Sequence, residues 1–324
     1  MTGREQIERA GELLASRLGR RLQRDVALAP MTTYRVGGPA ALFVDAAELA
    51  DLAAIAEARA ATGVPVLVVG RGSNMLVADT GFAGVAVSVA QLAGDITIDP
   101  ASPVVVAGGG VALPVAARRT AAAGLTGFEW AVGVPGSIGG AVRMNAGGHG
   151  SDMAACLVDV DVFDLAAGSA ELTTLPVAAL GLRFRASSLA PAHVVIRARL
   201  ALATGDRGRS EAEIADIVRW RREHQPGGQN CGSVFVNPVP GAVTAGALID
   251  SLGLRGTRFG TAWVSEKHAN FIQAGEGGTA ADVRRTIEAV RAQVADATGY
   301  HLRSEVRLVG FDDTDPLSFE EHAA

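Results

Sequence analysis

The stretch VPVLVVGRGSN, residues 64–74, carries a continuous apolar run straight into a glycine-rich loop. Such a run, bounded by turn residues, is typical of a buried strand, and apolar residues recur at helical spacing just before it, over residues 46–62. Glycines after a buried strand let consecutive backbone amides approach an anion such as a pyrophosphate. Because the loop lacks both the GxGxxG spacing of a Rossmann turn and the GxxxxGKS/T pattern of a nucleoside-triphosphate loop, we expect neither of those folds.

A second glycine-rich loop, GVPGSIGGAVRMNAG, spans residues 133–147. Glycine makes up 40 of the 324 residues, well above its average share of about 7%. Two separate loops of this kind, each associated with its own group of strands, could hold a diphosphate from both sides. The pair therefore favours a binding role over two simple turns.

The order of the remaining elements predicts an α+β fold, because strands and helices do not alternate regularly. Residues 1–24 mix charged and apolar side chains at helical spacing, so we expect an N-terminal amphipathic helix. Strands are expected at residues 64–69, 85–89, 96–98, 104–106, 157–163, 194–202 and 305–309. Further helices are expected at residues 46–62, 114–123, 210–224, 244–252 and 279–298.

A change of composition marks a domain boundary near residue 204, where TGDRGRS, residues 204–210, is polar and rich in turn residues. Ser210, with Glu213 three residues later, predicts the N-terminal cap of the helix that follows. The last dozen residues, 313–324, are expected to form a loose tail.

Composition excludes several classes of function. The net charge of −5 and the absence of a long basic run give no electrostatic basis for binding nucleic acid or an anionic membrane surface. No window contains the roughly 18 uncharged apolar residues of a membrane span, and the N-terminal segment does not resemble a signal peptide. Two distant cysteines, Cys156 and Cys231, are compatible with a reducing compartment, so we expect a cytoplasmic protein.

The octapeptide CGSVFVNP, residues 231–238, places the hydroxyl of Ser233 on a tight turn before an apolar strand, where a proton donor could lie. A single acidic residue, Glu305, opens the last expected strand. Cys231 is not accompanied by the histidine and acid or amide of a nucleophilic site. His268 and its neighbours show no metal-ligand spacing, so we expect no metal.

Six motifs together resemble one family, the UDP-N-acetylenolpyruvoylglucosamine reductases (UDP-N-acetylmuramate dehydrogenases) of bacterial peptidoglycan synthesis. They are TTYRVGG at residues 32–38, GRGSNMLV at 70–77, GVPGSIGGAVRMNAG at 133–147, CGSVFVNP at 231–238, VSEKHANFI at 264–272 and SEVRLVG at 304–310. The short run over residues 200–210 is similar to the smaller type of the family, which lacks an extra tyrosine-bearing loop.

The resemblance implies a two-subdomain FAD-binding fold of the vanillyl-alcohol-oxidase-like (PCMH) type, plus a C-terminal α/β substrate domain. We accordingly expect an N-terminal helix over residues 1–27, an FAD-binding domain over 28–203 that is split near residue 90, and a substrate domain over 204–312. The implied cofactors are non-covalent FAD, reduced by NADPH, and the implied partner is a UDP-sugar enolpyruvyl ether. Hydride would pass from flavin N5 to the terminal alkene carbon of that substrate.

The resemblance also implies roles for individual residues. Arg185 matches the family's catalytic arginine and could pair the developing carboxylate charge. Glu305 matches the catalytic glutamate, and Ser233 matches the proton donor. The implied cofactor-binding residues are Tyr34, Arg35, Gly70, Arg71, Gly72, Ser73, Asn74, Gly133, Pro135, Gly136, Ser137, Gly139, Gly140, Asn145 and Gly147. The implied substrate-binding residues are His224, Asn237, Lys267 and His268.

Three positions depart from the family pattern. Phe184 stands where members usually have tyrosine, and His224 and Val236 stand where many have lysine. His224 could replace lysine by carrying a charge or donating one hydrogen bond. His149 suggests covalent flavin attachment, but histidines with that function lie in the first glycine loop, which has none here. Two alternatives stay open: an oxidase or dehydrogenase acting on another small molecule, and a flavin-binding protein without catalysis.

Overall fold

The apolar run before the first glycine loop forms strand β3, Val66–Val68, where the sequence predicts a buried strand, but its three residues are only half-buried. The computed structural model describes residues 1–99, 101–167 and 171–311, so the expected tail at residues 313–324 lies outside the described residues. The chain folds as two compact units, and each unit is built from three separate segments of the sequence. Unit 1 comprises Met1–Val26, Ala40–Arg71 and Ala83–Arg221, and unit 2 comprises Ala27–Pro39, Gly72–Phe82 and the chain from Arg222 onward.

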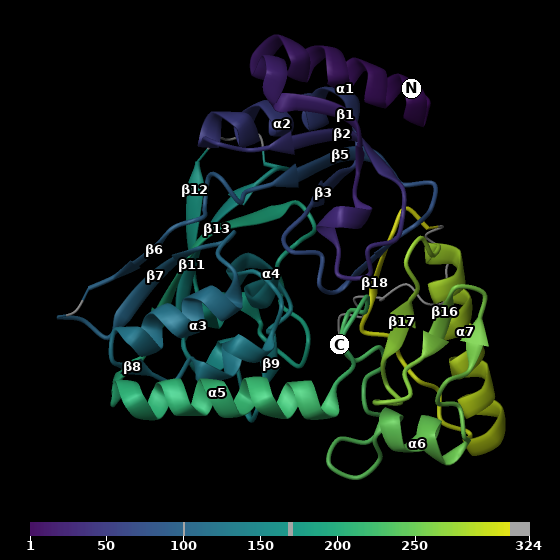
Figure 1. Cartoon of the computed structure of the whole chain (residues 1–324). Coiled ribbons are helices and arrows are strands. Elements are labelled where there is room, and N and C mark those ends of the chain that lie inside the picture. Colours follow the sequence, from purple (N-terminus) through teal and green to yellow (C-terminus); the bar gives the residue numbers. More distant parts are fainter. Residues whose placement is uncertain (100, 168–170, 312–324) are drawn as a thin grey trace. The chain divides into compact units, whose positions relative to one another are not determined.

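The first sheet has the strand order β1-β2-β5-β3, and β3 pairs in parallel with β5. Its strands are β1 (Leu22–Ala27), β2 (Pro39–Asp45), β5 (Phe82–Ser88) and β3. Helices α1 (Gly3–Leu18) and α2 (Leu49–Thr62) lie side by side next to this sheet (Figure 1). Leu14 of α1 and Leu52 of α2 are fully buried in one apolar cluster that also includes side chains of β2 and β5.

The N-terminal helix is shorter than the sequence suggests. It ends at Leu18, and Gly19 follows with φ of 54°, a backbone conformation that stops the helix. The chain then forms a short 3-10 helix and enters strand β1. Residues up to 27 are therefore only partly helical.

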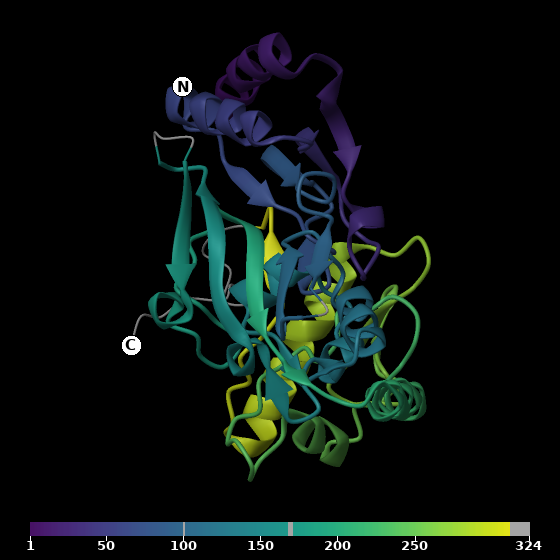
Figure 2. The same cartoon turned by 90° about the vertical axis from the view of Figure 1, so that its left-hand side faces the viewer.

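The second sheet of unit 1 is antiparallel, with the order β12-β11-β13-β7-β6. Its strands are β6 (Ile96–Ile98), β7 (Val104–Gly108), β11 (Leu157–Asp164), β12 (Leu172–Pro176) and β13 (His193–Ala201). Strands β11, β12 and β13, in teal and green, run next to one another in the turned view of Figure 2. Helices α3 (Leu113–Ala122) and α4 (Ile138–Arg143) contribute buried side chains to the same apolar cluster as this sheet.

Helix α5 spans Arg207–His224 and begins earlier than expected. The prediction that Ser210 caps this helix is wrong, because Ser210 is buried within it and its hydroxyl donates to Glu129 Oε1 at 2.5 Å. Asp206 Oδ1 instead accepts from the Arg209 N–H at 2.7 Å. The helix belongs to unit 1 as far as Arg221, since its buried isoleucines join the core of that unit.

Unit 2 contains the three-stranded antiparallel sheet β15-β16-β17, formed by Arg258–Phe259, Ala262–Val264 and Ile272–Ala274. Strand β4 (Met75–Val77) pairs in parallel with β18 (Arg307–Val309). Helix α7 (Ala280–Thr298) lies along β16 and β17, and α6 (Ala245–Ser251) is near it (Figure 1).

Short elements complete the fold. The paired strands are β8 (Leu125–Thr126) with β14 (Ala203–Thr204), and β9 (Gly147–Gly148) with β10 (Ser151–Asp152). The 3-10 helices are η1 (Gly19–Arg21), η2 (Ala29–Met31), η3 (Glu129–Gly133), η4 (Met153–Ala155) and η5 (Val177–Leu180). Among the described residues, no helix is long and apolar enough to cross a membrane.

The N-terminus of α7 is held by two side chains. Thr279 Oγ1 accepts from the Asp282 N–H at 3.1 Å, as an N-cap residue does. The carboxylate of Asp79, which follows β4, accepts from the Ala280 N–H at 2.8 Å and from the Ala281 N–H at 2.9 Å. Asp79 thereby ties the segment after β4 to the longest helix of unit 2 and places a negative charge at the positive end of that helix.

We expect Asp79→Ala to lower the free energy of unfolding by about 1–2 kcal/mol, because two N–H groups of the helix lose a charged acceptor. Asp79→Asn retains one acceptor and should lose less. Asp296→Ala is the matched control, since this aspartate lies in the last turn of α7, where a negative charge does not stabilise the helix. Urea unfolding of the three variants measures the differences, and equal midpoints for Asp79→Ala and wild type would show that the contacts contribute nothing.

Candidate active site

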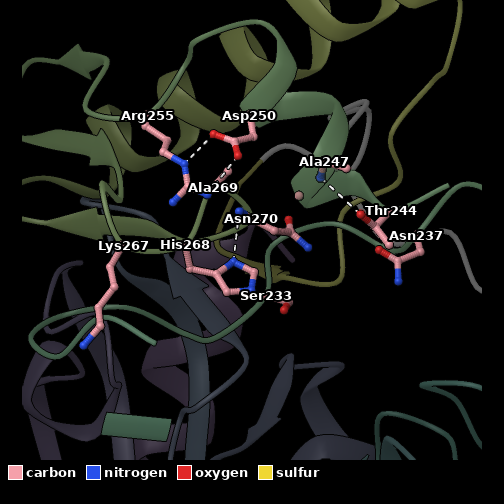
Figure 3. Close-up of a pocket in the computed structure, with 11 residues that line it drawn as sticks. Ser233, Asn237, Thr244, Ala247, Asp250, Arg255, Lys267, His268, Ala269 and Asn270 are labelled. Atoms are coloured by element: carbon pink, nitrogen blue, oxygen red, sulfur yellow. Dashed lines mark hydrogen bonds and ion pairs between the residues drawn. The ribbon is translucent and has the colours of Figure 1, made fainter. Parts of the chain in front are cut away.

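A pocket of about 390 Å³ opens in unit 2. Figure 3 shows the residues that line it, which come from the segment between Ser233 and Thr244, from helix α6 and the residues just after it, and from the segment between β16 and β17. They are Ser233, Asn237, Thr244, Gly246, Ala247, Asp250, Arg255, Lys267, His268, Ala269 and Asn270. Four residues to which the sequence assigns catalytic or substrate-binding roles therefore surround one cavity.

Ser233 follows a turn at Gly232, and the backbone conformation there accounts for the glycine. Gly232 has φ of 84°, a conformation that favours glycine, and its N–H donates to Asn230 Oδ1 at 3.0 Å. The segment after Ser233 is then buried, whereas Ser233 itself is exposed on the pocket wall. The turn thus presents the hydroxyl at the end of a fixed segment.

Glu305 lies beside this segment through backbone hydrogen bonds. Its N–H donates to the Val234 carbonyl at 2.7 Å, and the Val236 N–H donates to the Arg303 carbonyl at 2.9 Å. Only 9% of Glu305 is exposed. The structure therefore brings the predicted proton donor and the predicted catalytic acid together, although they are far apart in the sequence.

Asn74 also holds the backbone of Glu305, through its carbonyl. The Asn74 Nδ2 donates to the Glu305 carbonyl at 2.8 Å, and the Arg307 N–H donates to the Asn74 carbonyl at 3.0 Å. The sequence assigns Asn74 to cofactor binding, and that role stays a prediction. In the structure its side chain fixes the backbone of Glu305 within unit 2.

The four predicted substrate-binding residues lie in unit 2 but not all at the pocket. Asn237 Oδ1 accepts from the Ala245 N–H at 3.1 Å, at the start of α6. Lys267 lines the pocket, but its ammonium extends away from the other residues in Figure 3 and donates to the Arg222 carbonyl. His224 is the exposed last residue of α5 and does not line the pocket.

His268 has a defined hydrogen-bonding state. Its Nδ1 accepts from the Asn270 N–H at 3.2 Å, so in the neutral ring the proton resides on Nε2. Burial lowers the pKa of His268, and the positive charge of Arg255 lowers it further. A neutral imidazole with an Nε2–H can act as a hydrogen-bond donor at the wall it shares with Ser233.

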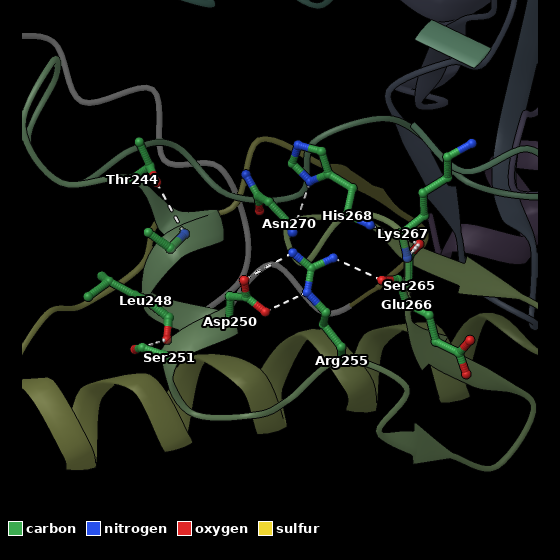
Figure 4. Close-up of polar contacts among 11 residues, drawn as sticks. Thr244, Leu248, Asp250, Ser251, Arg255, Ser265, Glu266, Lys267, His268 and Asn270 are labelled. Atoms are coloured by element: carbon green, nitrogen blue, oxygen red, sulfur yellow. Dashed lines mark hydrogen bonds and ion pairs between the residues drawn. The ribbon is translucent and has the colours of Figure 1, made fainter. Parts of the chain in front are cut away.

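Asp250 and Arg255 are pocket residues that the sequence analysis missed. Arg255 donates to both oxygens of Asp250, at 2.5 and 3.1 Å, and to the Glu266 carbonyl at 2.9 Å (Figure 4). The Asp250–Arg255 pair joins the end of α6 to the segment that carries Lys267 and His268. Two opposite charges five residues apart are common in any sequence, so no local pattern marks Asp250 and Arg255 as pocket residues.

Arg185 lies in unit 1, at the tip of a tight turn. Arg183 and Ala186 exchange two backbone hydrogen bonds of 3.0 and 3.1 Å. Arg185 has φ of 56°, which few non-glycine residues adopt and which is concentrated at functional sites. Its guanidinium lies over the ring of Phe184, 5.1 Å from the centroid, and Phe184 is 61% exposed.

Asn145 supports the turn of Arg185. Its Nδ2 donates to the Arg183 carbonyl at 3.3 Å and to Asp152 Oδ2 at 3.1 Å, and its Oδ1 accepts from the Ala154 N–H at 3.0 Å. The sequence assigns Asn145 to cofactor binding, which stays a prediction. The observed contacts show a buried amide that holds two backbone segments of unit 1.

Comparisons with known proteins identify the family. The family profile described as "UDP-N-acetylenolpyruvoylglucosamine reductase, C-terminal domain" matches residues 224–309, and the one described as "FAD binding domain" matches residues 40–173. The UDP-N-acetylenolpyruvoylglucosamine reductase of Heliobacterium modesticaldum is 43% identical over 281 residues, which is 86% of this chain and 88% of the relative. This chain belongs to the UDP-N-acetylenolpyruvoylglucosamine reductase family.

Further relatives agree with this assignment. The UDP-N-acetylenolpyruvoylglucosamine reductase of Synechococcus sp. strain WH7803 is 39% identical over 300 residues, covering 91% of this chain and 95% of its own. The crystal structure of the Thermus caldophilus reductase has a TM-score of 0.75 and 32% identity, covering 89% of this chain and 99% of that one. The resemblance and the expected fold class are thereby confirmed.

The reductase carries an FAD-binding domain, and the polar groups at its glycine loops fit such a cofactor. The N–H groups of residues 70–74 donate to no atom of the described residues. Trp130 Nε1, three residues before the second loop, and Thr33 Oγ1 are buried without a partner in the described part of the chain. Buried groups of this kind are costly unless a ligand atom pairs with them.

Two backbone amides of the second glycine loop already donate hydrogen bonds within unit 1. The Ile138 N–H donates to the Val111 carbonyl at 2.9 Å, and the Gly139 N–H donates to the Gly109 carbonyl at 2.8 Å. A side chain on Gly139 would approach the Gly109 carbonyl oxygen to 3.1 Å, so this glycine is explained by packing. Neither amide is available to a phosphate.

The predicted cofactor-binding residues are divided between the units. Gly70, Arg71, Gly133, Pro135, Gly136, Ser137, Gly139, Gly140, Asn145 and Gly147 belong to unit 1, and Tyr34, Arg35, Gly72, Ser73 and Asn74 belong to unit 2.

Tyr34 is fully buried in the apolar core of unit 2, where burial, together with the neighbouring Cys231, raises its pKa well above the usual value. Its hydroxyl lies beside the Cys231 thiol, and no hydrogen bond of ordinary geometry joins it to a described residue. The cofactor role of Tyr34 stays a prediction.

His149 packs edge-on against Trp220, with ring centroids 5.2 Å apart. This contact within unit 1 gives the histidine a structural role.

We expect His268 to titrate below the ordinary imidazole value of about 6.5, and Arg255→Gln to raise its midpoint by removing a nearby positive charge. Because the folded pKa is lowered, the contribution of His268 to stability is present above about pH 6.5 and is lost as the pH falls through the folded pKa. NMR of the ring protons, assigned with His268→Gln, measures both midpoints. A wild-type midpoint at or above the ordinary value would contradict this account.

Proposed function

We propose that this reductase uses FAD and NADPH to reduce UDP-N-acetylglucosamine enolpyruvate to UDP-N-acetylmuramate, a precursor of peptidoglycan. Membership of the reductase family and the match to an FAD-binding domain support the reaction. The observation that carries the proposal is the hydrogen-bonded pairing of the Ser233 and Glu305 segments beside one pocket. The substrate is a small UDP-sugar, and we expect the reaction to take place in the cytoplasm.

The reaction needs stabilisation of negative charge and delivery of one proton. Bound FAD, reduced by NADPH, supplies the hydride that reaches the terminal alkene carbon of the substrate. The substrate then carries enolate charge on its carboxylate, which a guanidinium and a protonated carboxyl group can stabilise. We assign these roles to Arg185 and Glu305. The strained turn of Arg185 and the burial of Glu305 support the assignment.

Ser233 then donates the proton to the carbon beside the carboxylate. A hydroxyl is a weak acid in water, so its position next to an enolate matters more than its intrinsic acidity. Ser233 is exposed, and it lines the same pocket as His268. The neutral ring of His268 can form a hydrogen bond there without adding charge. Asn237 and Lys267 are proposed to bind the substrate in this pocket, and His224 to assist from the end of α5.

We expect Ser233→Ala to leave the reduction of flavin by NADPH nearly unchanged and to slow flavin reoxidation by the enolpyruvyl substrate by about 10²-fold or more, the usual effect of losing a positioned acid. Anaerobic stopped-flow absorbance measures both half-reactions. Ser251→Ala is the matched control, because its exposed hydroxyl only bonds the Leu248 carbonyl at the end of α6. If Ser233→Ala slows both half-reactions equally, Ser233 has a structural role instead.

A further inference from the structure

Asn270 lies between β16 and β17. Its side-chain oxygen and nitrogen and its backbone N–H and carbonyl all form hydrogen bonds within unit 2. Its Oδ1 accepts from the Phe235 N–H at 3.0 Å, and its Nδ2 donates to the Phe235 carbonyl at 2.8 Å. Its backbone carbonyl accepts from the Val234 N–H at 2.9 Å, and its backbone N–H donates to His268 Nδ1 at 3.2 Å. Only 5% of Asn270 is exposed, so these bonds replace contacts with water.

The side chain of Asn270 acts on Phe235 as a neighbouring strand residue would. It satisfies both the backbone donor and the backbone acceptor of one residue, Phe235, which a directly opposite residue of an antiparallel strand also does. The opposite edge of the same segment is bonded to the Arg303–Glu305 backbone. Residues 234–236 are therefore held from two sides, and Ser233 is the first residue beyond the held segment.

We propose that Asn270 is a positioning residue for the proton donor: it clamps the backbone after Ser233, so that the Ser233 hydroxyl keeps a fixed place relative to Glu305 and His268. Asn270 does not contact the reacting atoms in this account. The inference rests on the proposed function, because it assigns a purpose to the position of Ser233. Figure 3 shows Asn270, His268 and Ser233 together at the pocket.

The chemistry of the clamp requires an amide. An aspartate would keep the acceptor for the Phe235 N–H but would face the Phe235 carbonyl with a second oxygen. An alanine would leave the backbone N–H and C=O of the buried Phe235 without the partners that Asn270 provides, which is costly. Misplacement of a reacting group by about 1 Å can slow a reaction by about 10²-fold. A small shift of the Ser233 turn is therefore enough to affect proton delivery.

The test is a double-mutant cycle on the FAD-bound, full-length protein, with Asn270→Asp, Ser233→Ala and the double variant. Asn270→Asp should leave flavin reduction by NADPH unchanged and slow reoxidation by the enolpyruvyl substrate by about 10²-fold. In the Ser233→Ala background the same change should slow reoxidation less than about threefold, because no donor is left to misplace. Asn270→Asp should also increase the solvent deuterium isotope effect on reoxidation, since proton transfer becomes the slower step.

Two controls separate this proposal from the proposed function and from general destabilisation. Thr286→Val removes a buried hydrogen bond of α7, from Thr286 Oγ1 to the Asp282 carbonyl, in the same unit but away from Ser233. It should leave both half-reactions unchanged. Asn270→Ala provides a second variant for the cycle if Asn270→Asp does not bind flavin normally.

The outcomes are distinct. If Asn270→Asp slows reoxidation by the same factor with and without Ser233, or slows both half-reactions, Asn270 is only structural and the proposal is overturned. If Ser233→Ala itself does not slow reoxidation, the proposed function of Ser233 fails, and the positioning role of Asn270 fails with it.

Discussion

The hydrogen bond from the Glu305 N–H to the Val234 carbonyl is the contact on which the arrangement of the site depends. It joins the turn that carries Ser233 to the start of the last strand. The bond thus links an exposed residue, Ser233, to a buried acid, Glu305. Strand β18 begins at Arg307, shortly after Glu305, and pairs with β4, so the position of this acid is anchored to the segment after the first glycine loop.

In three places, an asparagine side chain holds the backbone near a predicted catalytic residue. Asn74 bonds the Glu305 carbonyl, Asn145 bonds the turn of Arg185, and Asn270 bonds the segment after Ser233. A neutral amide can donate and accept at once, so it supports loop backbone without adding charge beside a developing anion. Sites that must stabilise charge in a fixed geometry need such support for their functional groups.

The sequence predicted the elements whose signals are local. Strand β3 and helices α2, α6 and α7 lie close to the ranges that the apolar pattern predicts, and the motif residues led to the correct family. Strands β1, β2 and β12 were missed; β1 and β12 are mostly exposed, so no alternation of apolar and polar residues marks them. The start of α5 was misplaced because the buried bond of Ser210 to Glu129 depends on residues distant in the sequence. The role of Asn270 was missed for the same reason, since its partners lie in another segment.

The central claim is that a positioned donor delivers a proton to one face of an enolate. The most direct measurement is the reduction of UDP-N-acetylglucosamine enolpyruvate in D2O, with NMR of the purified product. The account predicts a product that carries deuterium on the carbon beside the carboxylate in a single configuration, because Ser233 exchanges its proton with solvent and is held in one place. Formation of both configurations in comparable amounts, or failure of the enzyme to reduce this substrate, would contradict the account.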